Sequence, residues 1–198
     1  MCQLIESVCL ENGIIKNIQY HNMRMNKSRT ELFGCSNFLK IEDIMTIPRY
    51  AQTGIWKIRI HYSESITKIE FEQYKRKTIH SLQIVFSDSI EYAYKYADRT
   101  SIAQLFEKRN NADDILIIKG GFITDSSSAN VAFSNGIEWI TPATPLLPGT
   151  KRAKLLDEGI IKEDYIALKD IRKFSHICLI NAFLDVGNIL LPTSKIFF

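Results

Sequence analysis

Apolar and polar residues alternate in two neighbouring stretches of the first 80 positions, and this alternation predicts strands. In residues 56–62 the apolar side chains of Trp56, Ile58 and Ile60 share one face, and residues 66–74 alternate in the same way. Each stretch has the period of two that is typical of a half-buried strand. Because only a short polar segment separates them, we expect the two strands to pair antiparallel.

The residues before and between these strands predict a hairpin and helices. Residues 4–10 and 14–18 are apolar runs on either side of the turn sequence Glu-Asn-Gly, a pattern typical of a β-hairpin. A helix is predicted to follow residues 21–25. A second helix is predicted over 41–47, where Pro48 should end it. The first part of the chain is therefore expected to combine a sheet with helices.

Short apolar runs dominate the rest of the chain and predict a strand-rich half. Strands are expected over 81–86, 90–95, 114–119, 122–124, 130–133, 137–141, 166–168 and 176–180. A helix over 151–158 would have Thr150 as its N-cap and would stop at Gly159. The chain is assigned to the α+β class (mixed α/β), with an N-terminal α+β lobe at 1–80 and a C-terminal lobe at 81–198.

Composition and charge change this picture little, but they exclude several classes of protein. The 198 residues are 45% hydrophobic and 24% charged, which supports a real core and excludes global disorder and a coiled coil. The formal net charge is only +3, far from that of a nucleic-acid-coating protein. The basic run 74–77 lacks basic partners and interleaved aromatic residues, so we expect no nucleic-acid partner.

Cysteine spacing and hydropathy bear on compartment and metal binding. The four cysteines are Cys2, Cys9, Cys35 and Cys178; none forms a C-x-x-C pair, and no histidine stands at zinc-ligand spacing from them. We therefore expect reduced thiols and no metal site. The first residues lack the features of a signal peptide, and no run approaches the roughly 20 apolar residues of a membrane span. A cytoplasmic location without a membrane partner is the simplest expectation.

Lys95 is the first candidate for chemistry. It is predicted to end an apolar strand in which Tyr92 and Tyr94 share one face and Lys95 lies on the other. A lysine on the inner face of a core strand would be desolvated, and such lysines form Schiff bases. The alternative is a lysine at a solvent-facing strand edge, and spacing alone favours that alternative.

A second candidate is the loop at residues 148–152, which opens the predicted helix. Backbone N–H groups, the Thr150 hydroxyl and the helix dipole together form an anion site. Simple capping of the helix would explain the same residues. A third feature is Arg24, three residues after His21, which carries little meaning by itself.

Taken in chain order, these segments resemble the class IV aminotransferases, the fold-type IV enzymes that use pyridoxal 5′-phosphate (PLP). The resemblance spans nearly the whole chain. The matching segments are Leu4-Ile5-Glu6-Ser7, His21-Asn22-Met23-Arg24-Met25, Lys95 with Arg99, residues 123–133, Trp139-Ile140-Thr141-Pro142, residues 146–152, and Asn181-Ala182 before Pro192. They correspond to the family's F-E-T strand, H-x-x-R-[LM] segment, K-x-x-x-R lysine, V-x-E-[ST]-x-x-x-N-[IV]-F strand, T-P segment, L-x-G-[IVT]-x-R loop and last cofactor-contacting strand.

The resemblance implies a fold, a cofactor and a role for each matching residue. The fold would be a small α+β lobe followed by a strand-rich pseudo-barrel lobe that binds PLP. Lys95 would bind PLP as a Schiff base and move protons at the substrate carbon. Asp125 would face the pyridine nitrogen. Arg24, Thr150 and Asn181 would anchor the phosphate.

The sequence departs from the family pattern at three places. The family usually has glutamate where this chain has Asp125, which is one methylene shorter. The hydroxyl that often precedes the arginine of the phosphate loop is replaced by Lys151, and the hydroxyl of Thr150 comes one residue earlier. The chain is also far shorter than the usual member, so residues of the substrate pocket transfer poorly.

Two branches of the family compete for the function. Lys95 with Arg99 and the pair Asn181-Ala182 look more like 4-amino-4-deoxychorismate lyases, which form 4-aminobenzoate and pyruvate in the folate pathway. The alternative is an aminotransferase acting on branched-chain or D-amino acids with 2-oxoglutarate. A second alternative is a PLP-binding homologue without catalysis.

Two further expectations concern the substrate and the assembly. Arg59 lies on the polar face of the strand 56–62 with Lys57 and His61, and a substrate carboxylate requires a bidentate partner. A solvated strand face is the alternative. Because family members build each active site at a dimer interface, the resemblance implies a homodimer.

Overall fold

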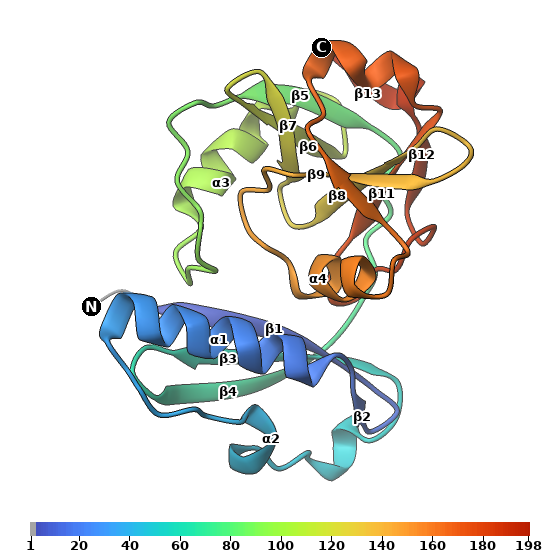
Figure 1. Cartoon of the computed structure of the whole chain (residues 1–198). Coiled ribbons are helices and arrows are strands. Elements are labelled where there is room, and N and C mark those ends of the chain that lie inside the picture. Colours follow the sequence, from blue (N-terminus) through green and yellow to red (C-terminus); the bar gives the residue numbers. More distant parts are fainter. Residues whose placement is uncertain (1–2) are drawn as a thin grey trace. The chain divides into compact units, whose positions relative to one another are not determined.

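The computed structural model describes residues 3–198, which divide into two compact units. The first unit contains the described residues up to Arg76 together with Tyr94–Asp98, and the second contains Lys77–Ala93 and Arg99–Phe198 (Figure 1). The predicted division into lobes at 1–80 and 81–198 stays a prediction, because the two compact units do not show whether either lobe folds by itself. Cys2 lies outside the described residues. Among residues 3–198, no helix is long and apolar enough to cross a membrane.

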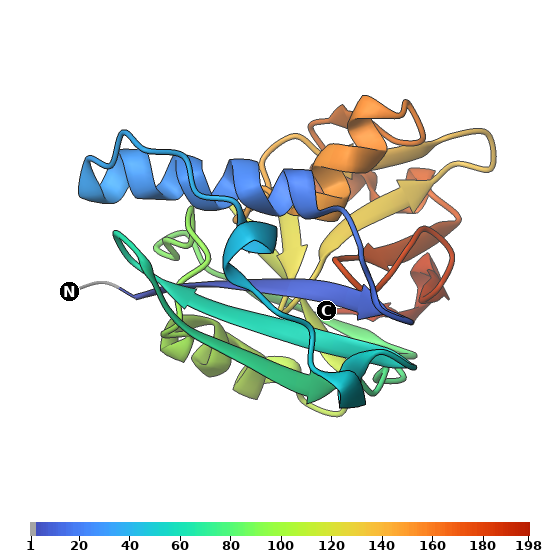
Figure 2. The same cartoon turned by 90° about the horizontal axis from the view of Figure 1, so that it is seen from below.

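The first unit is a four-stranded antiparallel sheet with a long helix on one face. The strand order is β2-β1-β3-β4, and the bounds are β1 Leu4–Glu11, β2 Ile14–Ile15, β3 Ile55–Tyr62 and β4 Ile66–Gln73. The helix α1 (Ile18–Phe33) lies along this sheet, as Figures 1 and 2 both show. Two short helices follow, α2 (Ile41–Ile44) and a 3₁₀ turn at Arg49–Ala51.

Alternating burial along β3 confirms the predicted face. Ile58 and Ile60 are fully buried, and they pack with Met25 of α1 in the core of the first unit. The hairpin between β1 and β2 is also confirmed. Its turn residues Asn12 and Gly13 have φ of 49° and 78°, the left-handed values that a type I′ turn requires.

Two boundaries in the first unit differ from the prediction. The return strand of the hairpin has only two residues, because α1 begins at Ile18 instead of after residue 25. The second helix ends at Ile44, and Met45 already has extended backbone (φ −111°, ψ 133°). Residues 45–47 therefore run extended into Pro48, in line with the restriction that a proline places on the preceding backbone.

The predicted strand at 90–95 was wrong. Residues up to Ala93 belong to the second unit, whereas Tyr94–Asp98 belongs to the first, so the alternating pattern spans a crossing between units. The crossing segment lies along the edge of β1: the Ile5 N–H donates to the Lys95 carbonyl (2.9 Å) and the Ala97 N–H to the Gln3 carbonyl (2.8 Å). Tyr94 and Tyr96 pack against the core of the first unit. Lys95 therefore lies at the edge of β1, outside any regular strand.

The second unit is built on a 9-stranded mixed sheet. The main strand order is β10-β9-β8-β7-β6-β5-β13, and β11 pairs with β8 and β12. The strands are β5 Leu82–Phe86, β6 Asp114–Lys119, β7 Phe122–Ser126, β8 Asn130–Ser134, β9 Trp139–Pro142, β10 Lys162–Asp164, β11 His176–Ile180, β12 Leu190–Pro192 and β13 Ile196–Phe197. The helices are α3 Thr100–Phe106 and α4 Thr150–Asp157, with 3₁₀ turns at Glu107–Arg109, Leu168–Lys173 and Thr193–Lys195.

Most strands of the second unit were predicted, and the strands that were not predicted have two or three residues. The strands 114–119 and 176–180 are confirmed with identical bounds. The predicted strand at 166–168 was wrong, because only Ala167 forms a bridge, to Phe122, and a 3₁₀ turn begins at Leu168. Strands β10, β12 and β13 were not predicted, since two or three residues carry no alternation. Thr150 is not the N-cap of α4; it is the first helical residue, after Gly149.

Candidate active site

The candidate residues are divided between the two units. Arg24, Arg59 and Lys95 belong to the first unit, and Asp125, Thr150 and Asn181 belong to the second. Each group is described in its own unit below.

A buried carboxylate organises the candidate residues of the first unit. Glu6 of β1 is fully buried and accepts three hydrogen bonds from α1. Arg24 donates from Nε to Oε1 (2.9 Å) and from Nη2 to Oε2 (2.6 Å), and His21 Nδ1 lies 2.7 Å from Oε2. His21 and Arg24 are three residues apart, so they project from the same face of the helix. Arg24 is thereby fixed in a two-pronged ion pair.

The charges in this cluster follow from its contacts. Burial by itself would raise the pKa of Glu6, but the Arg24 charge and the His21 contacts hold this pKa at about 2. Burial lowers the pKa of His21, Glu6 opposes that shift, and the charges of Arg24 and Lys95 add to it. Near neutral pH the cluster therefore contains an ionised Glu6, a charged Arg24 and a neutral His21, whose Nδ1 donates to the carboxylate.

Lys95 is half-buried, and its backbone carbonyl accepts a hydrogen bond from the Ile5 N–H of β1. Tyr94 and Tyr96, on either side of Lys95, pack against the core of the first unit, and the Lys95 charge acts on His21 of α1. Arg59 lies in β3 between Ile58 and Ile60, which are in the core, so its side chain projects on the face of the sheet away from that core. The first unit thus contains both Lys95 and Arg59.

Arg59 has an unsatisfied donor. Its Nε is buried and has no hydrogen-bond partner among the described residues. Oε2 of Glu72 lies 3.8 Å from Arg59 Nη2, beyond hydrogen-bond distance. The same oxygen forms an ion pair with Lys57 Nζ at 2.7 Å. A buried donor without a partner costs about 1–3 kcal/mol. The rest of the Arg59 side chain is partly exposed, at 40%, so its terminal guanidinium groups are the part that a ligand could reach.

Asp125 is a buried carboxylate of the second unit, and both of its oxygens have neutral donors. Asn130 Nδ2 donates to Oδ1 (2.7 Å), and the Leu147 N–H donates to Oδ2 (3.0 Å). Burial raises the pKa of Asp125 to about 6, although the Leu147 and Asn130 contacts oppose that rise. Each carboxylate oxygen has a second lone pair, so Asp125 can still accept a further hydrogen bond.

The loop before α4 is fitted closely to Asn130. A Cβ at Gly149 would lie 1.9 Å from Asn130 Oδ1, so only glycine is accommodated there. Gly149 is the N-cap of α4 and gives no side-chain cap, and the first turn contains no acidic residue. No side-chain cap and no acidic side chain therefore offsets the positive end of the α4 dipole, a geometry suited to a phosphate. Thr150 is buried at this helix start.

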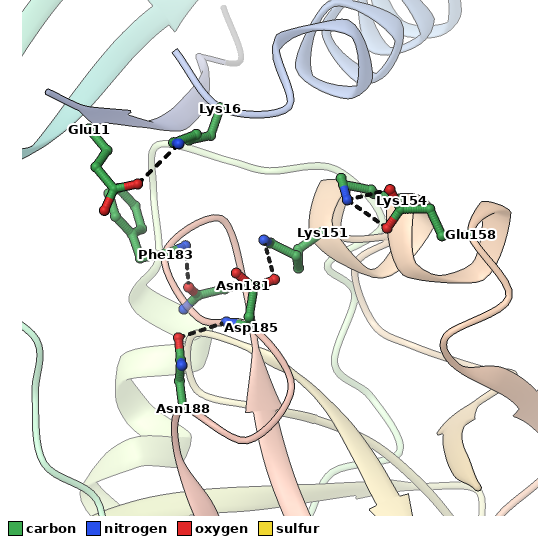
Figure 3. A network of polar contacts seen from close by, with 9 residues as sticks. All are labelled: Glu11, Lys16, Lys151, Lys154, Glu158, Asn181, Phe183, Asp185 and Asn188. Carbon is green, nitrogen blue, oxygen red and sulfur yellow. Dashed lines mark hydrogen bonds and ion pairs between the residues drawn. The ribbon is translucent and has the colours of Figure 1, made fainter. Parts of the chain in front are cut away.

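Asn181 lies where β11 ends and shapes the loop that follows. Its Oδ1 accepts from the Phe183 N–H (2.9 Å), and its Nδ2 donates to the Ser128 carbonyl (3.3 Å). In the same loop Asp185 accepts from Lys151 Nζ of α4 at 2.5 Å (Figure 3). Its backbone N–H donates to Asn188 Oδ1 at 3.0 Å. Asn181 is thus held on a loop that an ion pair connects to the start of α4.

Sequence reasoning missed three residues of these clusters. They are Glu6, Asn130 and Asp185. The signal for Glu6 was available, since a glutamate interrupts the apolar run of the first strand at a position that alternation directs inward. Asn130 was part of the matched strand motif, but its role in holding Asp125 depends on the three-dimensional pairing of β7 with β8.

Comparison with known proteins identifies the family. The family model described as "Amino-transferase class IV" matches residues 89–190. The chain belongs to the class IV aminotransferase family. This family consists of PLP-dependent enzymes, and the predicted fold-type IV, mixed α+β architecture is confirmed.

Two relatives of nearly the same length come from Haemophilus species. An "Uncharacterized protein" of Haemophilus influenzae is 42% identical over 184 residues, which cover 92% of this chain and 98% of that one. A crystal structure of a "putative 4-amino-4-deoxychorismate lyase" from Haemophilus somnus has 33% sequence identity and a TM-score of 0.86, covering 92% of this chain and 96% of that chain. The short length is therefore shared within this class IV group.

A third relative matches over a smaller part. A "Putative aminodeoxychorismate lyase" of Schizosaccharomyces pombe is 39% identical over 83 residues, which cover 39% of this chain and 36% of that one. Among more distant class IV structures, an aminotransferase from Brucella abortus was solved bound to PLP; it has 17% identity and a TM-score of 0.67, covering 96% of this chain and 79% of that one. At that identity the likeness shows the fold alone.

Proposed function

We propose that the chain is a PLP-dependent lyase that converts 4-amino-4-deoxychorismate into 4-aminobenzoate and pyruvate. The observation that carries the proposal is the similarity, over nearly the full length of both chains, to the Haemophilus somnus protein that bears this lyase name. The reaction needs no keto-acid acceptor and no oxidant, because the atoms of the substrate are all found in the two products. A place in folate biosynthesis and a cytoplasmic location go with this proposal.

The residues present fit the cofactor. In the second unit, the start of α4 with Thr150 would supply donors for the phosphate, and in the first unit the charged Arg24 would supply a cation. Asn181 is the third proposed phosphate contact, and Lys95 is the proposed point of covalent attachment. When bound, PLP supplies an electron sink for the bond broken at the amine-bearing carbon of the substrate.

Asp125 would accept a hydrogen bond from the protonated pyridine nitrogen. Its hydrogen-bond donors Asn130 and Leu147 are neutral, and among residues 3–198 the Arg152 charge acts on the carboxylate only from a distance. A cationic N–H is the partner that would lower its pKa from about 6 and strengthen its ionised form. Asn130 and Leu147 also fix the orientation of the shorter side chain that replaces the usual glutamate.

Lys95 would act as the base and acid of the reaction. Once its amine is free, it removes the proton from the amine-bearing carbon, and the enolpyruvyl group leaves as the ring becomes aromatic. The departing enolpyruvate takes up one proton to become pyruvate. Arg59 would bind a substrate carboxylate through its guanidinium, whose side chain is 40% exposed.

The test is a product assay on purified protein loaded with PLP. We expect 4-aminobenzoate and pyruvate in equal amounts from 4-amino-4-deoxychorismate, without 2-oxoglutarate, and loss of both products in Lys95→Ala. The matched control is Lys119→Met, which removes a lysine paired with Glu91. Amino-group transfer from a branched-chain or D-amino acid to 2-oxoglutarate, without lyase products, would replace the proposal by an aminotransferase. Bound PLP without either activity would indicate a non-catalytic homologue.

We also propose that the protein is a homodimer, as the family resemblance implies. The expected result is a mass near 46 kDa, about twice the 22.8 kDa of one chain, by light scattering at micromolar concentration. A monomer that retains full activity would contradict it.

A further inference from the structure

Lys151 is an unusual residue for the place that it occupies. It is the second residue of α4, directly before Arg152, where the family often has a hydroxyl. Its side chain is only 9% exposed, and its Nζ donates to Oδ1 of Asp185, whose side chain is 64% exposed (Figure 3). A nearly buried amine is thus neutralised by a carboxylate that is mostly in water.

The position of Lys151 opposes the dipole of its own helix. The first turn of α4 carries Lys151 and Arg152 and no acidic residue, and cations are unfavourable at the positive end of a helix. Arg152 is compensated by Glu163 at 2.7 Å and by the Pro142 carbonyl at 2.9 Å. The compensation of Lys151 comes from the exposed Asp185. An anion seated at this helix start would satisfy both the amine and the dipole.

We infer that Lys151 is an anion-binding residue that adds a positive charge to the phosphate site at the start of α4. Asp185 acts as its counterion in the ligand-free protein and is displaced when a phosphate binds. The inference rests on the proposed function, because the phosphate in question is that of PLP. It assigns to this chain a charged phosphate contact in place of the hydroxyl that is usual in the family.

The displacement of Asp185 is physically reasonable because the two anions differ in charge and exposure. A phosphate monoester carries about −1.5 to −2 charges near pH 7, against −1 for a carboxylate. Asp185 is mostly solvated already, so little hydration has to be restored when it leaves. The buried amine would keep an anionic partner throughout, which avoids an unpaired buried charge.

A purely structural role for the same ion pair makes a different prediction. In that case Lys151 and Asp185 would only connect the loop after β11 to α4, and removing either partner would loosen the loop. Both substitutions would then change ligand binding in the same direction. In the anion-binding role, Lys151→Met removes an attraction while Asp185→Asn removes a competitor, so the two substitutions act in opposite directions.

The experiment measures dissociation constants of PLP, pyridoxal and inorganic phosphate for ligand-free wild type, Lys151→Met and Asp185→Asn. We expect Lys151→Met to weaken PLP and phosphate about tenfold or more, since a charge-assisted hydrogen bond is lost, with little change for pyridoxal. We expect Asp185→Asn to tighten PLP and phosphate severalfold. Lys154→Met is the matched control, because Lys154 pairs with Glu158 at the other end of the same helix. Thermal unfolding of each variant checks that it is folded.

Weaker phosphate binding in Asp185→Asn, or an equal loss for PLP and pyridoxal in Lys151→Met, would overturn the inference and leave a structural connection. These outcomes are separate from a failure of the proposed function. Absence of a borohydride-stable PLP adduct on wild-type Lys95 would refute the proposed cofactor chemistry. The role of Lys151 would still be decided by inorganic phosphate, through the sign of the change in Asp185→Asn.

Discussion

Glu6 in the first unit and Asp125 in the second are both buried carboxylates, yet their surroundings shift their pKa values in opposite directions. Glu6 faces the charged Arg24, and its pKa falls to about 2. Asp125 faces the neutral Asn130 amide and Leu147 N–H, and its pKa rises to about 6. Burial favours the neutral acid, and the Arg24 charge together with the His21 contacts outweighs it at Glu6, whereas the hydrogen bonds and the Arg152 charge do not outweigh it at Asp125. Glu6 therefore has its charged partner within the chain, whereas in our proposal the charged partner of Asp125 is the cofactor.

The largest expected effect is on stability at the paired carboxylate. Glu6→Gln leaves the Arg24 guanidinium without its counterion inside the first unit. Removing one partner of a buried ion pair costs about 3–5 kcal/mol, and we expect that loss in the free energy of unfolding measured by urea denaturation at pH 7. The control is Glu70→Gln, which removes an exposed partner of His61 and should leave stability close to that of wild type. A Glu6→Gln variant as stable as wild type would refute the pairing.

The two carboxylates should also respond to pH with opposite signs. The folded-state pKa of Glu6 is depressed from 4.5 to about 2, so its stabilisation is present above pH 4.5 and is lost as pH falls toward 2. The folded-state pKa of Asp125 is raised from 3.8 to about 6, so without cofactor its ionisation removes stability as pH rises through this range. Two units correspond to roughly 3 kcal/mol as an upper limit.

The measurement for Asp125 is the free energy of unfolding of ligand-free wild type and Asp125→Asn between pH 4 and pH 7. Asparagine does not titrate, so the variant should gain on wild type as pH rises. Parallel curves for the two proteins would mean that Asp125 does not titrate in this range in the folded state.

The next effect concerns turnover. In the proposed site, Asp125→Asn would remove the charge that holds a proton on the pyridine nitrogen, and we expect kcat to fall by at least about 10²-fold, while the proposed phosphate contacts and Lys95 keep PLP bound. Asp125→Glu should also lose activity, because a longer side chain cannot keep its oxygens on Asn130 at 2.7 Å and Leu147 at 3.0 Å. Unchanged turnover in Asp125→Asn would show that another group protonates the ring.

The smallest effect is expected for the substrate. Arg59→Gln removes the donor whose Nε has no partner in the described structure, and we expect KM to rise about tenfold with kcat little changed, the pattern of lost ground-state binding. Lys68→Gln on the neighbouring strand β4 is the control, since its charge is taken by Glu70. An equal rise in KM for both variants would mean that Arg59 contributes only its positive charge at the surface and makes no specific contact with the substrate.

The sequence predicted features that depend on local pattern and missed those that depend on packing. Strands β3 and β6 were predicted because alternation or a continuous apolar run marks them. The predicted strand at 90–95 was wrong because its alternating pattern continues past Ala93, where the chain passes from the second unit to the first. Motifs located Arg24, but its partner Glu6 lies 18 residues earlier, and their pairing arises only when α1 packs on β1.

The most direct test of the account is to locate the PLP attachment. Purified protein should absorb in the visible or near-ultraviolet, and borohydride reduction followed by peptide mapping should place a phosphopyridoxyl group on Lys95. That result would support the assignment of the crossing segment beside β1 as the catalytic one. Labelling at Lys119 or Lys151, or no label at all, would contradict it.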